Sequence, residues 1–441
     1  MVTDAAFRDR QRARIIVVGA GFAGFEAARG LSRTAGDAAE IVLINPTNYF
    51  LYLPLLPDVA AGTLDPRRIA VSLAQTLPKV RLVLGSVEGI DLPGRAVTYL
   101  DAEGNSGTLG YDRLVLAAGS VNKLLPVPGI DEFAHGFRGI PEAVYLRDHI
   151  TCQVALADTT DDQAERDQRC TFVVVGAGYT GTEVAAQGPL ITDALLRHRP
   201  RLAGQKARWL LLDTAKRVLP TLDERLSRSS DRVLRRRGVE VMMGVSVKEA
   251  TREGVLLTDG EFVRTRSLIW CVGVHPDPLV SGLDLPLQQG RLVVDEFLGV
   301  PDHPELFACG DIAAVPDLTR PGEVTAMTAQ HATRQGKRAA ANVAASFGVG
   351  ERRAYKHHDL GFVVDLGGAQ AAANPLRVPL SGLPAKAVTR GYHLLAMPGN
   401  RVRTAADWAL NTVLPRESAE LDLVRGAAVP LDSPAPELPH R

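Results

Sequence analysis

The chain has 441 residues, 46% of them hydrophobic and 23% charged, so it can bury a large core and is long enough for two or three domains. Its 50 Lys and Arg are balanced by 50 Asp and Glu, which leaves no overall field to collect nucleic acid. The 4 cysteines form no CxxC pair, which favours a reducing compartment and argues against a disulfide framework, a zinc knuckle or a dithiol relay.

The amino terminus is polar up to the first predicted strand and has no apolar signal core. No later run approaches the roughly 18 apolar residues of a membrane span. We therefore expect a cytoplasmic protein.

A strand, a glycine-rich turn and a helix are predicted near the amino terminus. Residues 15–18 (IIVV) form a continuous apolar run, and helical spacing begins at residue 22. Between them, Gly19, Gly21 and Gly24 form a G-x-G-x-x-G pattern, which allows a tight turn, close approach to a pyrophosphate, and close packing of helix on strand. The helix then points the positive end of its dipole at the phosphates.

The same pattern recurs 157 residues later (176 minus 19). Strand 171–175 precedes Gly176, Gly178 and Gly181, and a helix follows. One such turn is weak evidence, whereas its repetition with strand and helix indicates two dinucleotide sites. We interpret one as the site of a flavin dinucleotide and the other as the site of a nicotinamide dinucleotide, so that a hydride can pass between them.

The strand after each turn is predicted to end near a ribose. At the first site Asn45 stands where an Asp or Glu is usual, so it can accept a hydrogen bond without charge. At the second site Asp213 is expected to pair with the 2'-hydroxyl of NAD and to repel the 2'-phosphate of NADP, which favours NADH. NADPH stays open because Lys216 and Arg217 follow closely.

Two further segments are similar to those that bracket the flavin in two-dinucleotide flavoprotein reductases: residues 111–120 (YDRLVLAAGS) and 306–313 (LFACGDIA). Together with CVG at 271–273, their order resembles the FAD-dependent pyridine nucleotide-disulphide oxidoreductase superfamily. Within it, residues 49–65 (YFLYLPLLPDVAAGTLD) and 328–336 (TAQHATRQG) most resemble type II NADH dehydrogenases, the single-chain NADH:quinone oxidoreductases.

The resemblance implies noncovalent FAD and two catalytic residues, Gln330 beside the isoalloxazine ring and Glu183 near the nicotinamide and the flavin. It places Asp311 at the ribityl chain with Gly310 beside it. A helix beginning around residues 326–330 would aim backbone N–H groups at flavin N1 and the C2 carbonyl. The other cofactor contacts expected are Val87, Ala118, Gly119, Ala329 and Gly273.

Two of these residues have second interpretations. Glu183 is equally interpreted as an acid in the first helical turn, favoured by the dipole. In the motif around Gln330, the later glutamine is Gln335, one place beyond the commonest spacing, so quinone contacts beyond Gln330 are not predicted.

The cysteines raise a rival function, because sulfide:quinone oxidoreductases share this fold and use cysteines beside the flavin. Cys309 and Cys271 are favoured as small apolar residues in buried strands. Cys152 and Cys170 flank the polar stretch 157–168, predicted as a surface loop. For the adjacent pair at residues 357 and 358, a solvated loop is favoured over a metal site.

The carboxyl-terminal segment begins with a strand and turn predicted at 362–368. In residues 400–415, an apolar stripe with arginines near its ends predicts an interfacial helix lying on a bilayer, or a helix docked on its own protein or a dimer partner. The stripe comprises Val402, Ala405, Ala406, Ala409 and Val413. Residues 426–441 are Pro-rich and predicted to be disordered.

The predicted fold is α/β, with two Rossmann-like dinucleotide-binding domains arranged as in glutathione reductase and a small third domain. The FAD domain is expected at 1–140 and 290–350, the NAD(H) domain at 141–289, and a membrane and quinone-access domain at 351–425. The expected reaction passes two electrons from NADH through FAD to menaquinone or ubiquinone without proton pumping, on the inner face of the cell membrane. The alternatives are a sulfide:quinone or ferredoxin/rubredoxin-type reductase and a redox sensor with little turnover.

Overall fold

The computed structural model describes residues 12–35, 38–414 and 419–432, which form two compact units. Unit 1 takes the described residues up to 51 together with 70–121 and 275–358. Unit 2 takes residues 52–69, 122–274 and the described residues from 359 onward. The predicted α/β class is confirmed, because each unit is built on a sheet with parallel central strands.

The elements of unit 1 are β1 (Ala13–Val18), α1 (Phe22–Thr34), β2 (Ala39–Asn45), β3 (Tyr49–Leu51), β4 (Ala70–Ser72), α4 (Leu73–Thr76), β5 (Arg81–Asp91), β6 (Ala96–Asp101), β7 (Ser106–Gly110), β8 (Arg113–Leu116), η3 (Pro278–Gly282), β19 (Leu287–Gln288), β20 (Arg291–Val293), β21 (Gly299–Val300), β22 (His303–Ala308), β23 (Ala313–Ala314) and α10 (Ala329–Ala345). The short strands β9 (Ser120–Asn122) and β18 (Val274–Pro276) lie where the chain passes from one unit to the other.

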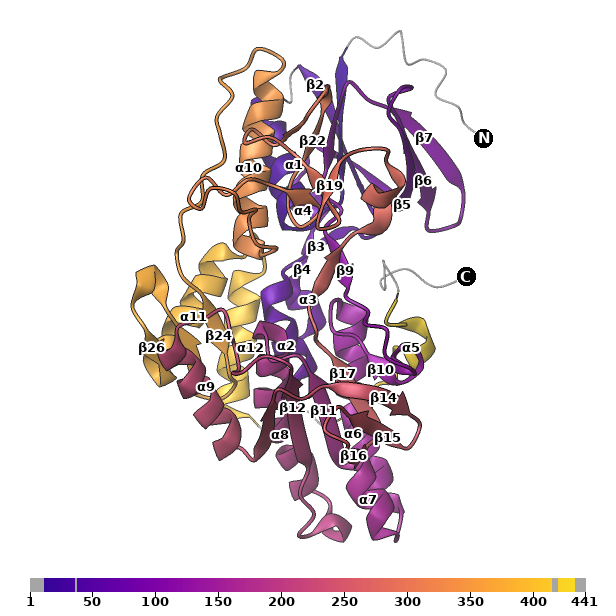
Figure 1. Cartoon of the computed structure of the whole chain (residues 1–441), viewed down its shortest axis with the longest axis vertical. Helices are drawn as coiled ribbons and strands as arrows, with labels where there is room; N and C mark the ends of the chain where they lie inside the picture. The colour runs from indigo at the N-terminus through magenta and orange to yellow at the C-terminus, as the bar shows by residue number, and fades with distance from the viewer. Residues whose placement is uncertain (1–11, 36–37, 415–418, 433–441) are drawn as a thin grey trace. The chain divides into compact units, whose positions relative to one another are not determined.

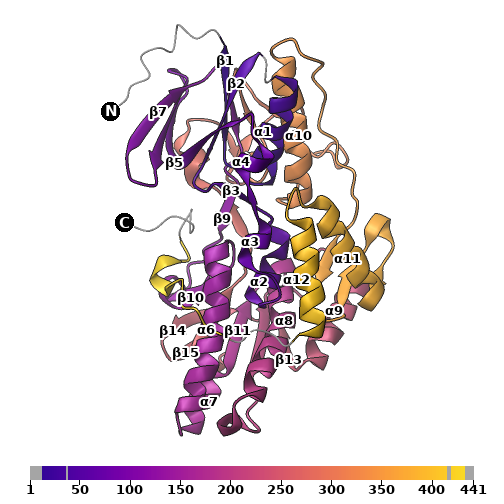
Figure 2. The same cartoon turned by 180° about the vertical axis from the view of Figure 1, so that it is seen from behind.

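Unit 1 is built on an eight-stranded sheet in the order β21-β22-β8-β1-β2-β5-β6-β7. The strands from β22 to β5 are parallel. The central strand β1 is an apolar run because parallel strands are covered on both faces. Helices α1 and α10 lie side by side (Figures 1 and 2). A Cβ at Gly336 of α10 would lie 2.1 Å from the carbonyl oxygen of Ala23, so only glycine permits this approach.

The elements of unit 2 are η1 (Leu53–Leu55), α2 (Leu56–Ala60), α3 (Pro66–Ile69), α5 (Ile130–Phe133), β10 (Ala134–His135), α6 (Ile140–Thr159), α7 (Gln163–Arg169), β11 (Thr171–Val175), α8 (Tyr179–Arg197), η2 (Pro200–Leu202), β12 (Arg208–Asp213), α9 (Glu224–Arg236), β13 (Val239–Met243), β14 (Val247–Thr251), β15 (Gly254–Leu257), β16 (Phe262–Arg264), β17 (Ser267–Trp270), β24 (Val363–Asp365), β25 (Ala371–Ala373), η4 (Pro375–Arg377), β26 (Leu380–Ser381), α11 (Gly382–Ala396), α12 (Arg401–Val413) and η5 (Gly426–Ala428).

Unit 2 is built on a five-stranded parallel sheet in the order β10-β17-β11-β12-β13. A second, antiparallel sheet β14-β15-β16 packs its apolar residues into the same core. A third, β24-β25-β26, is covered by α11. None of the helices in the described part of the chain combines the length and hydropathy that crossing a bilayer requires.

The boundaries of the two units differ from those expected for the domains. Residues 52–69 belong to unit 2, because α2 packs on α6 and α8. The carboxyl-terminal segment from residue 359 also belongs to unit 2, where β24 packs on α8. The assignment of these units to FAD and NAD(H) stays a prediction.

Two local predictions require correction. The predicted loop at 157–168 is mostly helical: α6 continues to Thr159, and Asp162 caps α7 by accepting a hydrogen bond from the N–H of Ala164 at 2.9 Å. Part of the predicted disordered tail is packed, because Leu431 is buried in the core of unit 2 and its carbonyl accepts from Asn122 Nδ2 at 3.1 Å, while residues 426–428 are exposed. Residues 433–441 lie outside the described residues.

Candidate functional site

The first glycine turn has the geometry that its sequence pattern predicts. Gly19 has a φ of +90°, and a Cβ there would lie 2.5 Å from the carbonyl oxygen of Ala117 and 3.0 Å from Cα of Ala118. A Cβ at Gly24 would lie 1.8 Å from the carbonyl oxygen of Gly19, so α1 packs directly on the turn. A Cβ at Gly21 would meet nothing within 4 Å. The backbone at Gly21 is therefore open to close approach by a phosphate group.

The second turn repeats this geometry residue by residue. Gly176 has a φ of +104°, and a Cβ there would lie 2.2 Å from the carbonyl oxygen of Cys271. A Cβ at Gly181 would lie 1.8 Å from the carbonyl oxygen of Gly176, and one at Gly178 would meet nothing within 4 Å. Gly273, with a φ of +100°, also faces open space. Each unit thus carries one cradle of the same shape.

Asn45 and Asp213 occupy matching positions beside the two turns. Asn45 Oδ1 accepts a hydrogen bond from the N–H of Ala20 at 2.7 Å, and Asp213 Oδ2 accepts one from Ala177 at 2.5 Å. An amide oxygen can make this contact as well as a carboxylate can, which explains why Asn is tolerated at the first site. The difference is charge, since Asp213 alone places a carboxylate at the end of its strand.

The other predicted flavin contacts lie around the loops after β8 and β22. Gly119 has a φ of +83° and open space at its Cβ position. A Cβ at Gly310 would lie 2.9 Å from Ala23 Cβ and 3.8 Å from Ala332 Cβ. The amino-terminal turns of α1 and α10 therefore converge on the loop after β22. Val87 lies in β5, opposite Tyr99 of β6.

Asp311 and its neighbours form a hydrogen-bonded loop. Asp311 Oδ2 accepts from Ser120 Oγ at 2.9 Å, and burial raises the pKa of this carboxyl, partly offset by Ser120 and Arg291. The N–H of Gly310 donates to Gln335 Oε1 at 2.8 Å, and Gln335 Nε2 donates to Thr325 Oγ1 at 2.9 Å. Gln335, which the sequence left without a role, is thus a structural clamp on the loop that carries Asp311.

Helix α10 begins at Ala329, within the predicted range 326–330. Thr328 caps it, with Oγ1 accepting from the N–H of His331 at 3.3 Å. Ala329 and Gln330 are the first two residues of α10 and so lie in its first turn. The half-buried Gln330 therefore stands at the positive end of the α10 dipole.

Glu183 is the fifth residue of α8, which begins at Tyr179, so the first-turn interpretation does not account for it. Its Oε1 accepts from the N–H of Asp365 at 2.8 Å. Burial raises the pKa of Glu183 well above its usual value. The Asp365 N–H bond opposes this shift, while the carboxyls of Asp365 and Asp58 add to it.

Glu183 lies in what we call the carboxyl cluster, whose other members are Asp58, Asp365 and Lys386. Lys386 Nζ contacts Asp365 Oδ1 and Oδ2, both at 2.5 Å, and both side chains are 8% exposed. Asp58 is 4% exposed and accepts from Thr63 Oγ1 at 2.8 Å. Burial, with Asp365 nearby, raises the pKa of Asp58 to about 6. Three carboxyls around one lysine favour retention of a proton in the cluster.

Sequence reasoning identified only Glu183 of this cluster. One signal was present in the printed chain, because Asp58 interrupts the apolar run LLPDVAAG. A carboxylate in such a run needs a buried partner. The positive charge that most lowers the pKa of Asp58 belongs to Lys386, which lies 328 residues away (386 minus 58), beyond the reach of any local pattern.

The cysteines and histidines show no catalytic arrangement in the described residues. Burial raises the pKa of Cys309 and that of Cys271 to about 12, so both are protonated thiols at neutral pH and poor nucleophiles. His357 is half-buried and stacks on His331 with ring centroids 3.9 Å apart, while His358 is exposed, so the pair lies in a loop as predicted, with one of its two rings packed. In the described residues, no group of three or more His, Cys, Asp or Glu is arranged to hold a metal.

Comparisons with known proteins agree with this geometry. Residues 13–336 match the family model described as pyridine nucleotide-disulphide oxidoreductase. A type II NADH:quinone oxidoreductase of Mycobacterium tuberculosis is 32% identical over 420 residues, which cover 91% of this chain and 88% of that protein. A mitochondrial internal alternative NAD(P)H-ubiquinone oxidoreductase of Solanum tuberosum is 27% identical, over 94% and 90% of the two chains.

The fold is similar to a solved structure of NDH2 from Plasmodium falciparum in complex with NADH. The TM-score is 0.85 at 17% identity, and the match covers 93% of this chain and 100% of that one. At this identity the match supports the fold alone.

Proposed function

The chain belongs to the type II NADH:quinone oxidoreductases, within the pyridine nucleotide-disulphide oxidoreductase family, and from this premise we propose that it passes two electrons from NADH through noncovalent FAD to a quinone. The observation that carries the proposal is the pair of glycine turns with matching backbone geometry, one in each unit. Bound FAD would supply the chemistry that joins a two-electron hydride donor to a quinone.

The first turn fits FAD. Gly21 and Gly119 offer open backbone to the pyrophosphate, and Asn45 stands at the end of β2. Asp311, held by Ser120, would accept hydrogen bonds from the ribityl hydroxyls. The first turn of α10, with Ala329 and Gln330, would stabilise negative charge on the reduced ring.

The second turn fits NADH. Its open glycine, Gly178, would admit the pyrophosphate, and Asp213 would accept the 2'-hydroxyl of the adenosine ribose. A 2'-phosphate would meet the Asp213 carboxylate, so we expect NADPH to be the poorer donor. Glu183 lies two residues after Gly181, within one helical turn of this cradle.

The reaction also consumes a proton, because NADH and H⁺ reduce a quinone to a quinol and release NAD⁺. NADH supplies a hydride, and the other proton must come from solution through the protein. We assign its supply to the carboxyl cluster, in which burial favours the protonated form of Glu183. Asp58, with a pKa of about 6, would exchange protons near neutral pH.

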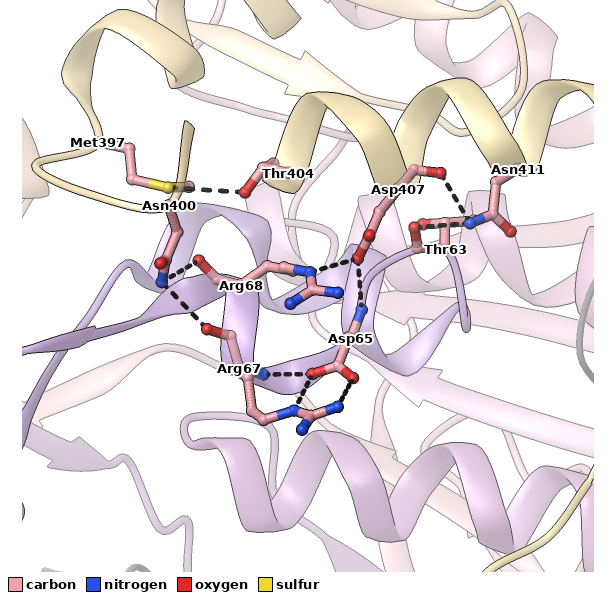
Figure 3. A network of polar contacts seen from close by, with 9 residues as sticks. All are labelled: Thr63, Asp65, Arg67, Arg68, Met397, Asn400, Thr404, Asp407 and Asn411. Atoms are coloured by element: carbon pink, nitrogen blue, oxygen red, sulfur yellow. Dashed lines mark hydrogen bonds and ion pairs between the residues drawn. The ribbon is translucent and has the colours of Figure 1, made fainter. Parts of the chain in front are cut away.

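We further propose that α12 lies on the inner face of the cell membrane, so that the quinone enters from lipid. Figure 3 shows that Asp407 and Asn411 of α12 point toward α3 and the segment before it: Asp407 Oδ2 accepts from Arg68 Nε at 2.8 Å, and Asn411 Nδ2 donates to the carbonyl of Thr63 at 3.2 Å. Val402 and Val413, in contrast, are 83% and 78% exposed. An amphipathic helix with its polar face inward leaves its apolar face for lipid.

Trp408 and Leu395 mark the limits of this apolar surface. Trp408 of α12 is buried in unit 2, with Arg390 over its ring at 4.9 Å, and so does not belong to the surface. Leu395 at the end of α11 is 77% exposed and extends the apolar surface. A second copy of the chain is the alternative occupant of this surface, and its binding would appear as dimerisation.

The first test measures NADH oxidation by the FAD-loaded protein with and without a short-chain quinone, with NADPH and sulfide as parallel donors. We expect fast turnover that requires both NADH and quinone. Flavin reduction by NADH without quinone turnover would contradict the proposal and leave a sensor or a protein-acceptor reductase. Turnover with sulfide in place of NADH would indicate the sulfide:quinone reaction.

The second test is flotation with vesicles of phosphatidylglycerol and phosphatidylcholine. The double variant V402E/V413E is expected to stay with the soluble fraction, whereas the wild type floats. The control L287E changes a 40% exposed leucine of unit 1 and should float. If the wild type stays soluble and V402E/V413E only dissociates a dimer in sedimentation, the apolar surface is a protein interface.

A further inference from the structure

Unit 2 contains a cavity that the proposed electron transfer does not use. Its volume is about 370 Å³, within the range of small-molecule sites. It reaches Ser267 and Leu268, the first two residues of β17. Cys271, directly after the last residue of β17, contacts Gly176 of the second glycine turn. The cavity and the dinucleotide cradle therefore lie at opposite ends of the same strand.

One wall of the cavity is aromatic and uncharged. His135 lies between Tyr145 and His149, with ring centroids 4.9 Å and 4.8 Å away, and all three line the cavity. Burial lowers the pKa of His135 to about 4 and that of His149 to about 3, so both rings are neutral at pH 7. His149 Nε2 is fixed by Ser267 Oγ at 2.9 Å. Such a wall is a surface on which a flat ring can stack.

The cavity is also lined by a group of positively charged residues, all arginines. Arg169, Arg252 and Arg266 line the cavity. Arg169 is neutralised by Glu165 at 2.7 Å. Arg252 and Arg266 form no ion pair within the described part of the chain; Arg266 Nη1 donates only to the backbone carbonyl of Arg252 at 2.6 Å, and its Nε has no acceptor there.

The charges decide between ligand classes. The lining residues include a single carboxylate, Glu132, among those that the structure describes. Two arginines that line the cavity without an ion pair among the described residues match a dianion better than a single carboxylate, and arginine binds phosphate through paired N–H groups. The aromatic wall favours a ligand that also carries a flat ring, which can stack on it. A nucleoside monophosphate satisfies both requirements and fits the volume.

We propose that this cavity is a binding site for a nucleoside monophosphate, separate from the dinucleotide sites. The base stacks on His135, Tyr145 and His149, and the phosphate binds Arg252 and Arg266. The cavity gives the enzyme a third nucleotide site, through which the level of free nucleotide can act on unit 2.

The test is calorimetric titration of the FAD-loaded protein with AMP in the presence of saturating NAD⁺, which occupies the dinucleotide cradle. We expect binding of one AMP, at least tenfold weaker in R252Q and in R266Q. Arg252 is exposed, so R252Q should fold normally. The matched control R264Q changes an exposed arginine of β16 that does not line the cavity and should bind as the wild type.

Hydrogen exchange provides the location. AMP should slow exchange at residues 265–268 and leave residues 176–181 unchanged. AMP binding that is seen without NAD⁺ but not in its presence would place AMP in the dinucleotide cradle and overturn the proposal, as would equal affinities in R266Q and R264Q, or no binding at all. Neither measurement involves turnover, so failure here is distinct from failure of the proposed electron transfer.

Discussion

Replacing Lys386 by Met tests the physical basis of the carboxyl cluster. The substitution keeps most of the side-chain volume and removes the one lysine among three carboxyls. Lys386 and Asp365 are each 8% exposed and 2.5 Å apart. Removing one partner of a buried ion pair costs about 3–5 kcal/mol, because the other charge stays buried without compensation.

The sign of the pH dependence follows from the same contacts. Lys386 lowers the pKa of both Asp58 and Glu183, so its loss raises both further. Without Lys386, the buried carboxyls are charged and uncompensated at high pH, which is costly, whereas at low pH they are protonated and the cost is small. We expect K386M to lower the free energy of unfolding by about 3–5 kcal/mol at pH 8 and by clearly less at pH 5.

The assay is urea unfolding of the FAD-loaded protein at both pH values. The double variant K386M/D365N should recover most of the loss, because neither charge of the pair remains. The control K248M changes an exposed lysine of unit 2 and should stay within about 0.5 kcal/mol of the wild type. A cost for K386M below about 1 kcal/mol at pH 8, or a larger cost at pH 5 than at pH 8, would refute the buried-pair reasoning.

Three other predictions follow from single residues. Folding raises the pKa of Asp58 from 3.8 to about 6. The stability that protonated Asp58 contributes is therefore fully present below pH 3.8 and is lost as pH rises through about 6. At about 1.36 kcal/mol per pKa unit, D58N should raise the free energy of unfolding, measured with urea, by up to about 3 kcal/mol at pH 8 and by little at pH 4. G178A should keep the wild-type melting temperature, because the added Cβ meets no protein atom, yet it should raise the KM for NADH about tenfold or more. G181A should lower the melting temperature, because the added Cβ lies 1.8 Å from a carbonyl oxygen. Equal effects of the two substitutions on melting temperature and KM would contradict the cradle geometry. Q335A removes the acceptor of the Gly310 N–H and should weaken FAD retention on gel filtration, with Q330A as the comparison that leaves this bond intact.

The features predicted well from the sequence depend on neighbouring residues. Both glycine turns were identified because strand, turn and helix follow one another within a dozen residues, and the observed φ angles of Gly19 and Gly176 require glycine. Helix α10 begins within the range 326–330 that the resemblance implied, and Thr328, a good capping residue, is a local signal that agrees with this start. Local rules, repeated in context, were sufficient there.

The features that the sequence did not disclose depend on distant partners. Burial raises the pKa of Glu183, and the carboxyls of Asp365 and Asp58, which come from segments on either side of it in the chain, raise it further. Polar composition suggested a loop at 157–168, but the segment is held as helix by its cap at Asp162. The Pro-rich end of the chain suggested disorder, yet Leu431 is buried because it packs among the apolar side chains of the unit 2 core.

The discontinuous make-up of unit 1 has a consequence for biosynthesis. Leu306 of β22 pairs with Leu114 of the central strand β8, and 192 residues separate them (306 minus 114). At about 5–20 residues per second, the ribosome delivers β22 roughly 10–40 s after β8. During that interval the edge of β8 is unpaired, and the loop carrying Asp311 does not yet exist. The growing chain is therefore more prone to aggregate than the finished protein, and the FAD site proposed above is complete only after the loop at Asp311 has been made.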